Sequence, residues 1–126
     1  MIYKHEENRL PELRFVGGET HRLAYSFQYD DGSMIDLTNV HRAWFSIQRP
    51  DSNSRYALRS FTMQKSAAEG MHALVLILDP QDTLDLDGMY DYQITIKQND
   101  EAGTVRIPGH GTLIVLPNLA RDLLAD

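Results

Sequence analysis

The sequence predicts an all-β fold, an antiparallel β-sandwich or barrel of about eight short strands. Short stretches of alternating apolar and polar residues recur along the chain, and a turn rich in Gly, Pro, Asp or Asn closes each one. The clearest of these alternating stretches is 88–97, where Tyr90, Tyr92, Ile94 and Ile96 fall on one face. Helical character is confined to one turn near 79–84 and a short C-terminal tail. The other strands are interpreted as partners for the strand at 88–97.

Length, composition and charge describe a single domain. The chain has 126 residues, no cysteine and a formal net charge of −6. A chain of this length buries roughly two thirds of its unfolded surface, so it holds a core without disulfides. The charge argues against a nucleic-acid partner, and the longest aliphatic run, residues 73–78, is too short to cross a membrane. We expect a loose polar lead-in over residues 1–12, the β-sandwich over 13–117 and a tail of helical character over 118–126.

The first half of the chain contains four expected strands, each followed by a breaker or turn. They are residues 13–16, 20–29, 34–37 and 40–49, separated by Gly17-Gly18, by residues 30–33 and by Thr38-Asn39. Within the fourth strand, Phe45 and Ile47 share a face, whereas Trp44 falls on the opposite face with Arg42. Pro50 is expected to end this strand, and a polar loop follows.

The second half contains five further strand candidates. They are residues 56–63, 71–78, 88–97, 104–107 and 111–116. The apolar residues of 56–63 break strict alternation, which predicts a bulge near Arg59 or Ser60. Asp79 and Pro80 are placed to begin one helical turn that crosses from one sheet to the other. Pro108-Gly109 is expected to end the strand at 104–107.

The segment 84–92 resembles the tyrosine corner of immunoglobulin-like sandwiches. Its Asp87-Gly88-Met89-Tyr90 entry places a tyrosine just after a tight turn, where the ring packs under the turn and the hydroxyl bonds to the backbone. Tyr92 stands where antibody domains carry a cysteine, so an antibody-type domain is excluded. The expected fold is therefore an immunoglobulin-like antiparallel sandwich without a disulfide, with Asp87, Gly88 and Tyr90 as its structural corner.

A wider resemblance covers residues 13–116. Its motifs are Gly17-Gly18-Glu19-Thr20, Tyr29-Asp30-Asp31-Gly32, residues 35–40, residues 43–47, Asp79-Pro80, residues 88–94 and residues 107–115. With these motifs the chain resembles the N-terminal domain of phage baseplate upper proteins and related small phage and prophage tail proteins. The resemblance implies a non-enzymatic structural or docking module, located in the virion tail and assembled in the host cytoplasm. Its partners would be other tail or baseplate proteins, with the chain docked on them or assembled as a homo-oligomer.

The chain has no motif for catalysis, phosphate binding or metal binding. Its five histidines do not lie at metal-ligand spacing: His5, His21, His41, His72 and His110. The acidic run from Asp82 to Asp91 matches only part of an EF-hand loop, because Thr83 and Ile94 stand where its first and last ligands belong. A solvated turn is the preferred interpretation of this run, and a surface calcium site is the alternative. We therefore expect no enzyme activity, no cofactor and no metal site.

Three residues are candidates for an interface: Trp44, Arg42 and Tyr56. Tryptophan, tyrosine and arginine are enriched at interface hot spots, and the predicted core has no evident need of these three. The alternative for Trp44 is that a loop or a second sheet covers it. A second hypothesis for the whole chain is a carbohydrate- or ligand-binding module that uses exposed aromatic residues, namely Trp44 and neighbouring tyrosines.

Overall fold

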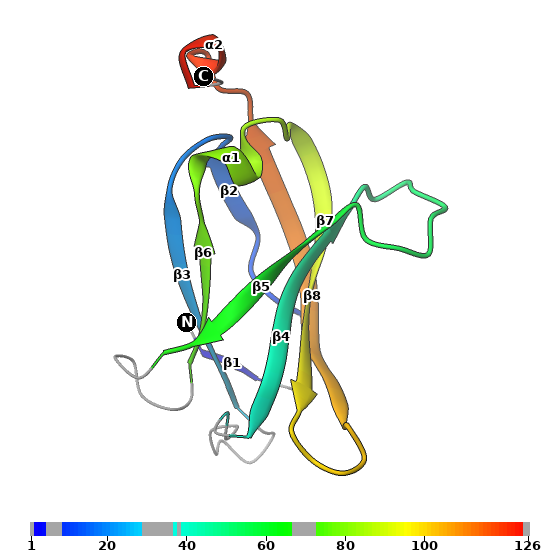
Figure 1. Ribbon diagram of the computed structural model, residues 1–126. Helices are drawn as coiled ribbons and strands as arrows, with labels where there is room; N and C mark the ends of the chain where they lie inside the picture. Colours follow the sequence, from blue (N-terminus) through cyan, green and yellow to red (C-terminus); the bar gives the residue numbers. More distant parts are fainter. Residues whose placement is uncertain (1, 5–8, 29–36, 38, 67–72, 125–126) are drawn as a thin grey trace.

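The computed structural model confirms the all-β fold and describes residues 2–4, 9–28, 37, 39–66 and 73–124. Within them lie eight strands and two short helices (Figure 1). In chain order these are β1 (Ile2–Lys4), β2 (Leu13–Val16), β3 (His21–Gln28), β4 (Val40–Gln48), β5 (Arg59–Lys65), β6 (Leu74–Leu78), α1 (Pro80–Thr83), β7 (Gly88–Gln98), β8 (Val105–Leu116) and α2 (Arg121–Leu124). The helical turn near 79–84 and the short helical tail are thus both present, as predicted.

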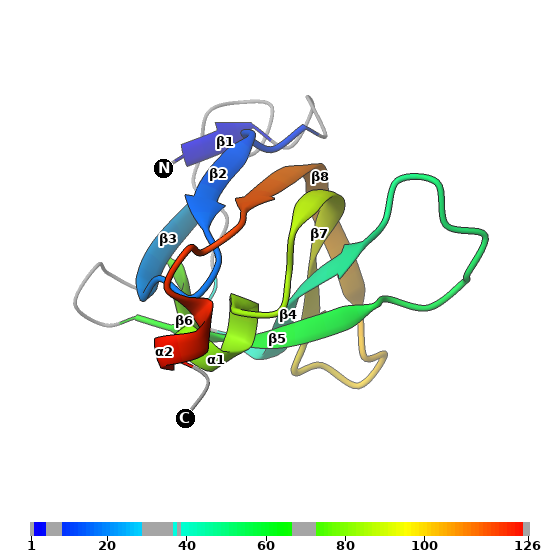
Figure 2. The same cartoon turned by 90° about the horizontal axis from the view of Figure 1, so that it is seen from above.

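All eight strands belong to one hydrogen-bonded sheet that curls over itself. The strand order is β1-β3-β6-β5-β4-β7-β8-β2. Seen from above, β3 and β6 face β4, β7 and β8 across the interior, so the curl forms two layers (Figure 2). The central pairs are antiparallel, whereas the outermost pairs, β1 with β3 and β2 with β8, are parallel. The sequence did not predict these two parallel pairs, because their partners lie far apart in the chain.

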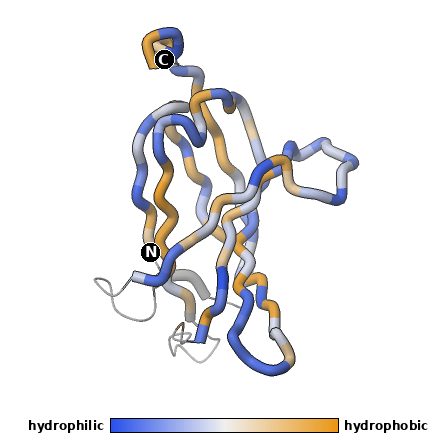
Figure 3. The backbone as a smooth tube through the Cα atoms, in the orientation of Figure 1, coloured by the Kyte–Doolittle hydropathy of each residue, from blue (hydrophilic) through white to orange (hydrophobic). Residues whose placement is uncertain are grey.

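Inward-facing side chains from both layers form the core. The largest fully buried ones are Tyr25, Phe27, Leu37, Phe45, Ile47, Leu74, Leu76, Leu78, Tyr90, Tyr92, Ile94 and Ile96. The rings of Phe45 and Tyr92 stack with their centroids 4.7 Å apart. Figure 3 shows the hydrophobic colour of β6, in which only Ile77 is exposed. Because fully burying such a side chain contributes roughly 1.5–3 kcal/mol, this set holds the two layers together.

The strand expected over 56–63 begins later than predicted, and it is regular. β5 starts at Arg59 and pairs with β4 without a register shift as far as Met63. The predicted bulge near Arg59 or Ser60 is therefore wrong. The alternation is broken because Tyr56 and Leu58 lie in the loop before the strand, where they are 80% and 53% exposed.

The strands expected over 104–107 and 111–116 form one strand, β8, which runs through Pro108. Its register with β7 shifts by one residue, since Ile94 pairs with Gly109 while Ile96 pairs with Arg106. A bulge accommodates proline because its extra residue needs no ladder hydrogen bond. The prediction that Pro108 ends a strand is therefore wrong.

Within the expected lead-in, the described residues 2–4 and 9–12 make contacts with the sheet. β1 pairs with β3, and Leu10 is 4% exposed. The Tyr92 hydroxyl donates a hydrogen bond to the carbonyl oxygen of Pro11 (2.6 Å), which ties the lead-in to β7. Of the turn predicted at 30–33 and the strand predicted at 34–37, all but the buried Leu37 lies outside the described residues.

Candidate functional site

A groove of about 680 Å³ lies on the outer face of the sheet, where β4, β7 and β8 run side by side. One wall is the loop over residues 49–58, which joins β4 to β5 and stands away from the body of the domain (Figure 1). The lining residues are Ser46, Ile47, Gln48, Ser54, Arg55, Tyr56, Ala57, Asp91, Tyr92, Gln93 and His110. A second hollow of about 360 Å³ shares Asp91 and His110 with it and extends to Arg9 and Glu12.

Hydrogen bonds fix the backbone of the 49–58 loop. The Gln48 side-chain amide and the Ser54 hydroxyl both donate to the carbonyl oxygen of Tyr56. The Tyr56 N–H donates back to the Ser54 hydroxyl oxygen (3.2 Å), and the Leu58 N–H donates to the Ile47 carbonyl (2.8 Å). The loop therefore holds Tyr56 at a defined position, although this residue is 80% exposed.

Strand register arranges the floor of the groove as a polar grid. Residues two apart on a strand share a face, so outer-face residues of neighbouring strands stand in rows. The two rows are Gln48, Asp91 and Thr112, and then Ser46, Gln93 and His110. Ser46 bonds to Ser60 of β5 (2.8 Å between hydroxyl oxygens), and the Gln93 amide donates to the Thr95 hydroxyl (3.0 Å). These contacts orient the amide and hydroxyl groups of the floor.

Three ionisable side chains of the groove are exposed: Arg55, Asp91 and His110. Within the part of the chain that the structure describes, none of these side chains forms a hydrogen bond or ion pair. They supply a cation, an anion and an imidazole to one hollow. The groove is therefore polar without carrying charge of a single sign.

The structure does not bring the predicted interface residues together. Tyr56 lines the groove, whereas Trp44 and Arg42 are not among its lining residues. Trp44 is half-buried on the outer face of β4, between Thr62 of β5 and Thr95 of β7. Arg42 is exposed further along the same strand. An interface that uses all three residues would have to extend over the outer face from the loop to the start of β4.

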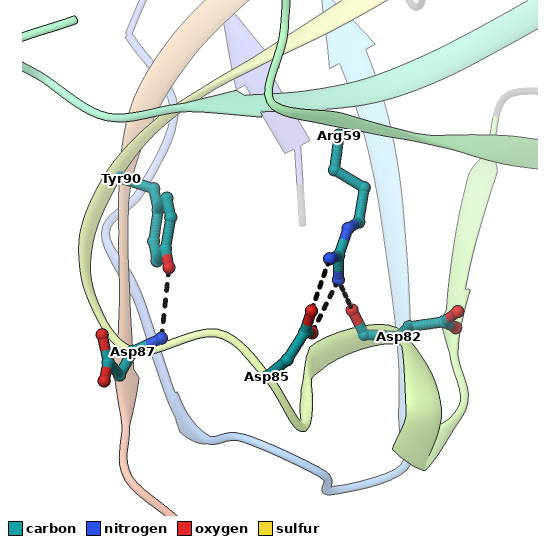
Figure 4. A network of polar contacts seen from close by, with 5 residues as sticks. All are labelled: Arg59, Asp82, Asp85, Asp87 and Tyr90. Carbon is teal, nitrogen blue, oxygen red and sulfur yellow. Dashed lines mark hydrogen bonds and ion pairs between the residues drawn. The ribbon is translucent and has the colours of Figure 1, made fainter.

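The corner residues Asp87, Gly88 and Tyr90 do come together, at the entry to β7. The Asp87 N–H donates to the Tyr90 hydroxyl oxygen, 3.1 Å away (Figure 4). Gly88 has φ of 89°, a left-handed conformation that favours glycine. The Arg49 guanidinium carbon lies 4.2 Å from the centroid of the Tyr90 ring, and an Arg49 nitrogen lies 3.4 Å from the Asp87 carboxylate. These contacts stabilise the turn at the entry to β7.

A second polar cluster fastens β5 to the turn after α1. Arg59 donates to both carboxylate oxygens of Asp85, at 3.0 and 2.8 Å, and to the Asp82 carbonyl at 2.6 Å (Figure 4). The hydrogen bonds from Arg59 hold the pKa of the Asp85 carboxyl below its ordinary value. The same contact raises the pKa of Arg59. The acidic run thus contributes two carboxylates to ion pairs, Asp85 with Arg59 and Asp87 with Arg49, where the preferred interpretation of the sequence was a solvated turn.

Sequence reasoning missed the residues that form the groove floor, chiefly Asp91, Gln93 and His110. Their outer-face position follows from the alternation of 88–97, but their association depends on the registers of β4, β7 and β8. In the described ranges no three His, Cys, Asp or Glu side chains are grouped to hold a metal ion. No helix in those ranges is both long enough and apolar enough to span a bilayer.

Comparison with known proteins gives a likeness in structure alone. No family model matches the chain, and no curated protein matches it. Among solved structures, the N-terminal domain of phage TP901-1 ORF48 superposes with a TM-score of 0.52 at 12% sequence identity. The match covers 92% of this chain and 99% of that one. The resemblance to a phage N-terminal domain, inferred above from the motifs over residues 13–116, is thus confirmed at the level of the fold.

Proposed function

We propose that the chain is a non-enzymatic structural or docking module of a phage or prophage tail or baseplate that works through protein–protein contacts. The observation that carries this proposal is the likeness to the phage ORF48 domain, which spans nearly the whole of both chains. The sequence motifs over residues 13–116 support the same conclusion independently of the coordinates. The partners would be other tail or baseplate proteins or further copies of the chain, and the location would be the virion tail after assembly in the host cytoplasm.

The C-terminal end of the sheet offers a contact surface of the right chemistry. Leu119 and Leu123 are 101% and 79% exposed, and Leu116 at the end of β8 is 39% exposed. The segment is nevertheless held against the domain, because Gln81 donates to the Leu124 carbonyl (3.0 Å) and Asn118 donates to the Gly17 carbonyl (2.8 Å). Exposed leucines on an anchored segment are typical of a surface that a partner covers.

The direct test is to purify virions from the host that encodes the chain and to locate the chain with antibodies. We expect labelling at the tail, with the chain present in stoichiometric amount by mass spectrometry. Particles that lack the chain would overturn the proposal.

Two variants then test the contact surface. A double variant, Leu119→Ala with Leu123→Ala, should lower incorporation into particles. Val105→Ala is the matched control, because Val105 is 55% exposed at the far end of β8. Equal incorporation of the double variant and the control would remove the C-terminal surface from the proposal.

A further inference from the structure

We propose that the outer-face groove is a carbohydrate-binding site. In this site Tyr56 provides a flat surface for a sugar ring, and Asp91, Gln93 and His110 bind its hydroxyl groups. This inference does not rest on the tail function, because it follows from the groove alone. It also differs from the sugar-binding hypothesis based on Trp44, which lies outside the groove.

The backbone N–H and C=O groups of the groove floor form hydrogen bonds between strands, so a ligand must bind through side chains. β4 pairs with β5 on one side and β7 on the other, and β7 pairs with β4 and β8. In the middle of β8, the Leu10 N–H donates to the His110 carbonyl oxygen (2.9 Å). An extended peptide that binds by strand addition needs a free edge, whereas β4, β7 and the His110 carbonyl of the floor already have backbone partners. Side-chain recognition instead favours a ligand rich in hydroxyl groups.

The side chains of the floor match the chemistry of a sugar. Sugar hydroxyls both donate and accept hydrogen bonds, and the groove presents a carboxylate acceptor at Asp91, an amide at Gln93 and an imidazole at His110. No other described side chain forms a hydrogen bond or ion pair with the side chain of Asp91 or His110, so both can bind sugar hydroxyls. The exposed ring of Tyr56 offers an apolar face to the C–H groups of the sugar.

Charge and size agree with an uncharged ligand of modest length. Arg55 and Asp91 are of opposite sign, and the chain as a whole carries −6, so a nucleic acid is disfavoured. The volume of about 680 Å³ lies within the range of small-molecule sites, roughly 300–1,000 Å³. The second hollow, of about 360 Å³, continues from Asp91 and His110 and gives room for further sugar units.

The site is also organised before a ligand arrives. The loop backbone at Tyr56 is held by Gln48 and Ser54, and Ser54 is itself held because its N–H donates to the Ser52 hydroxyl (3.1 Å). Ordering a flexible loop on binding would cost affinity, and this loop already has its hydrogen bonds. These bonds fix an aromatic residue that the core does not use.

The experiment is a glycan array probed with the full chain, covering uncharged oligosaccharides of hexoses and N-acetylhexosamines. Hits are then titrated in solution by calorimetry. We expect at least one oligosaccharide to bind, and Tyr56→Ala to weaken it by about tenfold through loss of the aromatic surface. Asp91→Asn and His110→Ala should also weaken it, whereas Tyr56→Phe should retain most of the affinity.

Leu58→Ala is the matched control, because Leu58 belongs to the same loop and is 53% exposed but does not line the groove. Its affinity should equal that of the unmodified chain, and all variants should keep the same melting temperature. Absence of binding to every oligosaccharide on the array would overturn the proposal. Equal loss of affinity for Leu58→Ala and Tyr56→Ala would do the same, because the groove would then not be the site.

Discussion

The corner at residues 87–90 and the loop at residues 49–58 are each built around a tyrosine, and the two tyrosines have opposite environments. Tyr90 is 1% exposed, with its hydroxyl bonded to the Asp87 N–H. Tyr56 is 80% exposed, although Gln48 and Ser54 hold its backbone. The corner uses its tyrosine to stabilise the fold, whereas the loop presents its tyrosine to solvent.

The difference separates the residues that the fold needs from those that a ligand or partner needs. Substituting an exposed side chain usually changes stability by no more than about 0.5 kcal/mol, so stability does not explain the ordered backbone around Tyr56. The proposed binding role of Tyr56 would explain why hydrogen bonds hold the backbone of this loop in place. Variants of the two tyrosines and their neighbours therefore test the distinction.

The largest expected effect is that of Tyr90→Ala. Removing a buried aromatic side chain should lower the free energy of unfolding by about 3–5 kcal/mol. Tyr56→Ala, the matched change in the loop, should alter it by no more than about 0.5 kcal/mol. Urea denaturation of both variants measures the two values. Similar losses in both would show that Tyr56 is part of the core after all.

Gly88→Ala should have a smaller effect, about 1–2 kcal/mol, because Gly88 has φ of 89°. The added methyl group would also lie 2.8 Å from the Arg49 guanidinium, which packs on Tyr90. Gly103→Ala is the control, since Gly103 has φ of 63° but its new methyl group would meet only the Lys97 side chain, at 3.8 Å. Chemical denaturation should show the greater loss for Gly88→Ala, and the reverse order would argue against a tightly packed corner.

The ion pair between Arg59 and Asp85 should give a small dependence of stability on pH. Because the folded state lowers the pKa of Asp85, its contribution is complete above the unfolded pKa of about 3.9 and is lost as the pH falls through the lower folded value. Both side chains are partly exposed, so the contribution should not exceed about 1 kcal/mol. Denaturation of the unmodified chain and Asp85→Asn from pH 7 to pH 2 should show their stabilities converging at low pH. A constant difference would contradict this account.

Local patterns predicted the parts of this fold that depend on neighbouring residues. The alternation of 88–97, the turn chemistry at Gly88 and the helical turn at Pro80 each arise within a few residues, and each is present in the structure. The resemblance of residues 84–92 to a tyrosine corner likewise rests on residues that are close together in the chain. These features need no knowledge of which strands become neighbours.

The features that the sequence did not predict depend on pairing between strands that lie far apart in the chain. The parallel pairing of β1 with β3, and of β2 with β8, orders segments whose own residues give a weak strand signal. Arg49 reaches the Tyr90 ring only because β4 lies beside β7. The groove likewise requires the register that sets Gln93 between Ser46 and His110. No local pattern encodes these registers.

The most direct test of the distinction between the two tyrosines is the free energy of unfolding of Tyr90→Phe, compared with that of Tyr56→Phe. Removing the Tyr90 hydroxyl leaves the Asp87 N–H without its partner and should cost about 1 kcal/mol. Removing the exposed Tyr56 hydroxyl should leave the free energy of unfolding unchanged within error. A Tyr90→Phe variant as stable as the unmodified chain, or a Tyr56→Phe variant destabilised equally, would contradict the account.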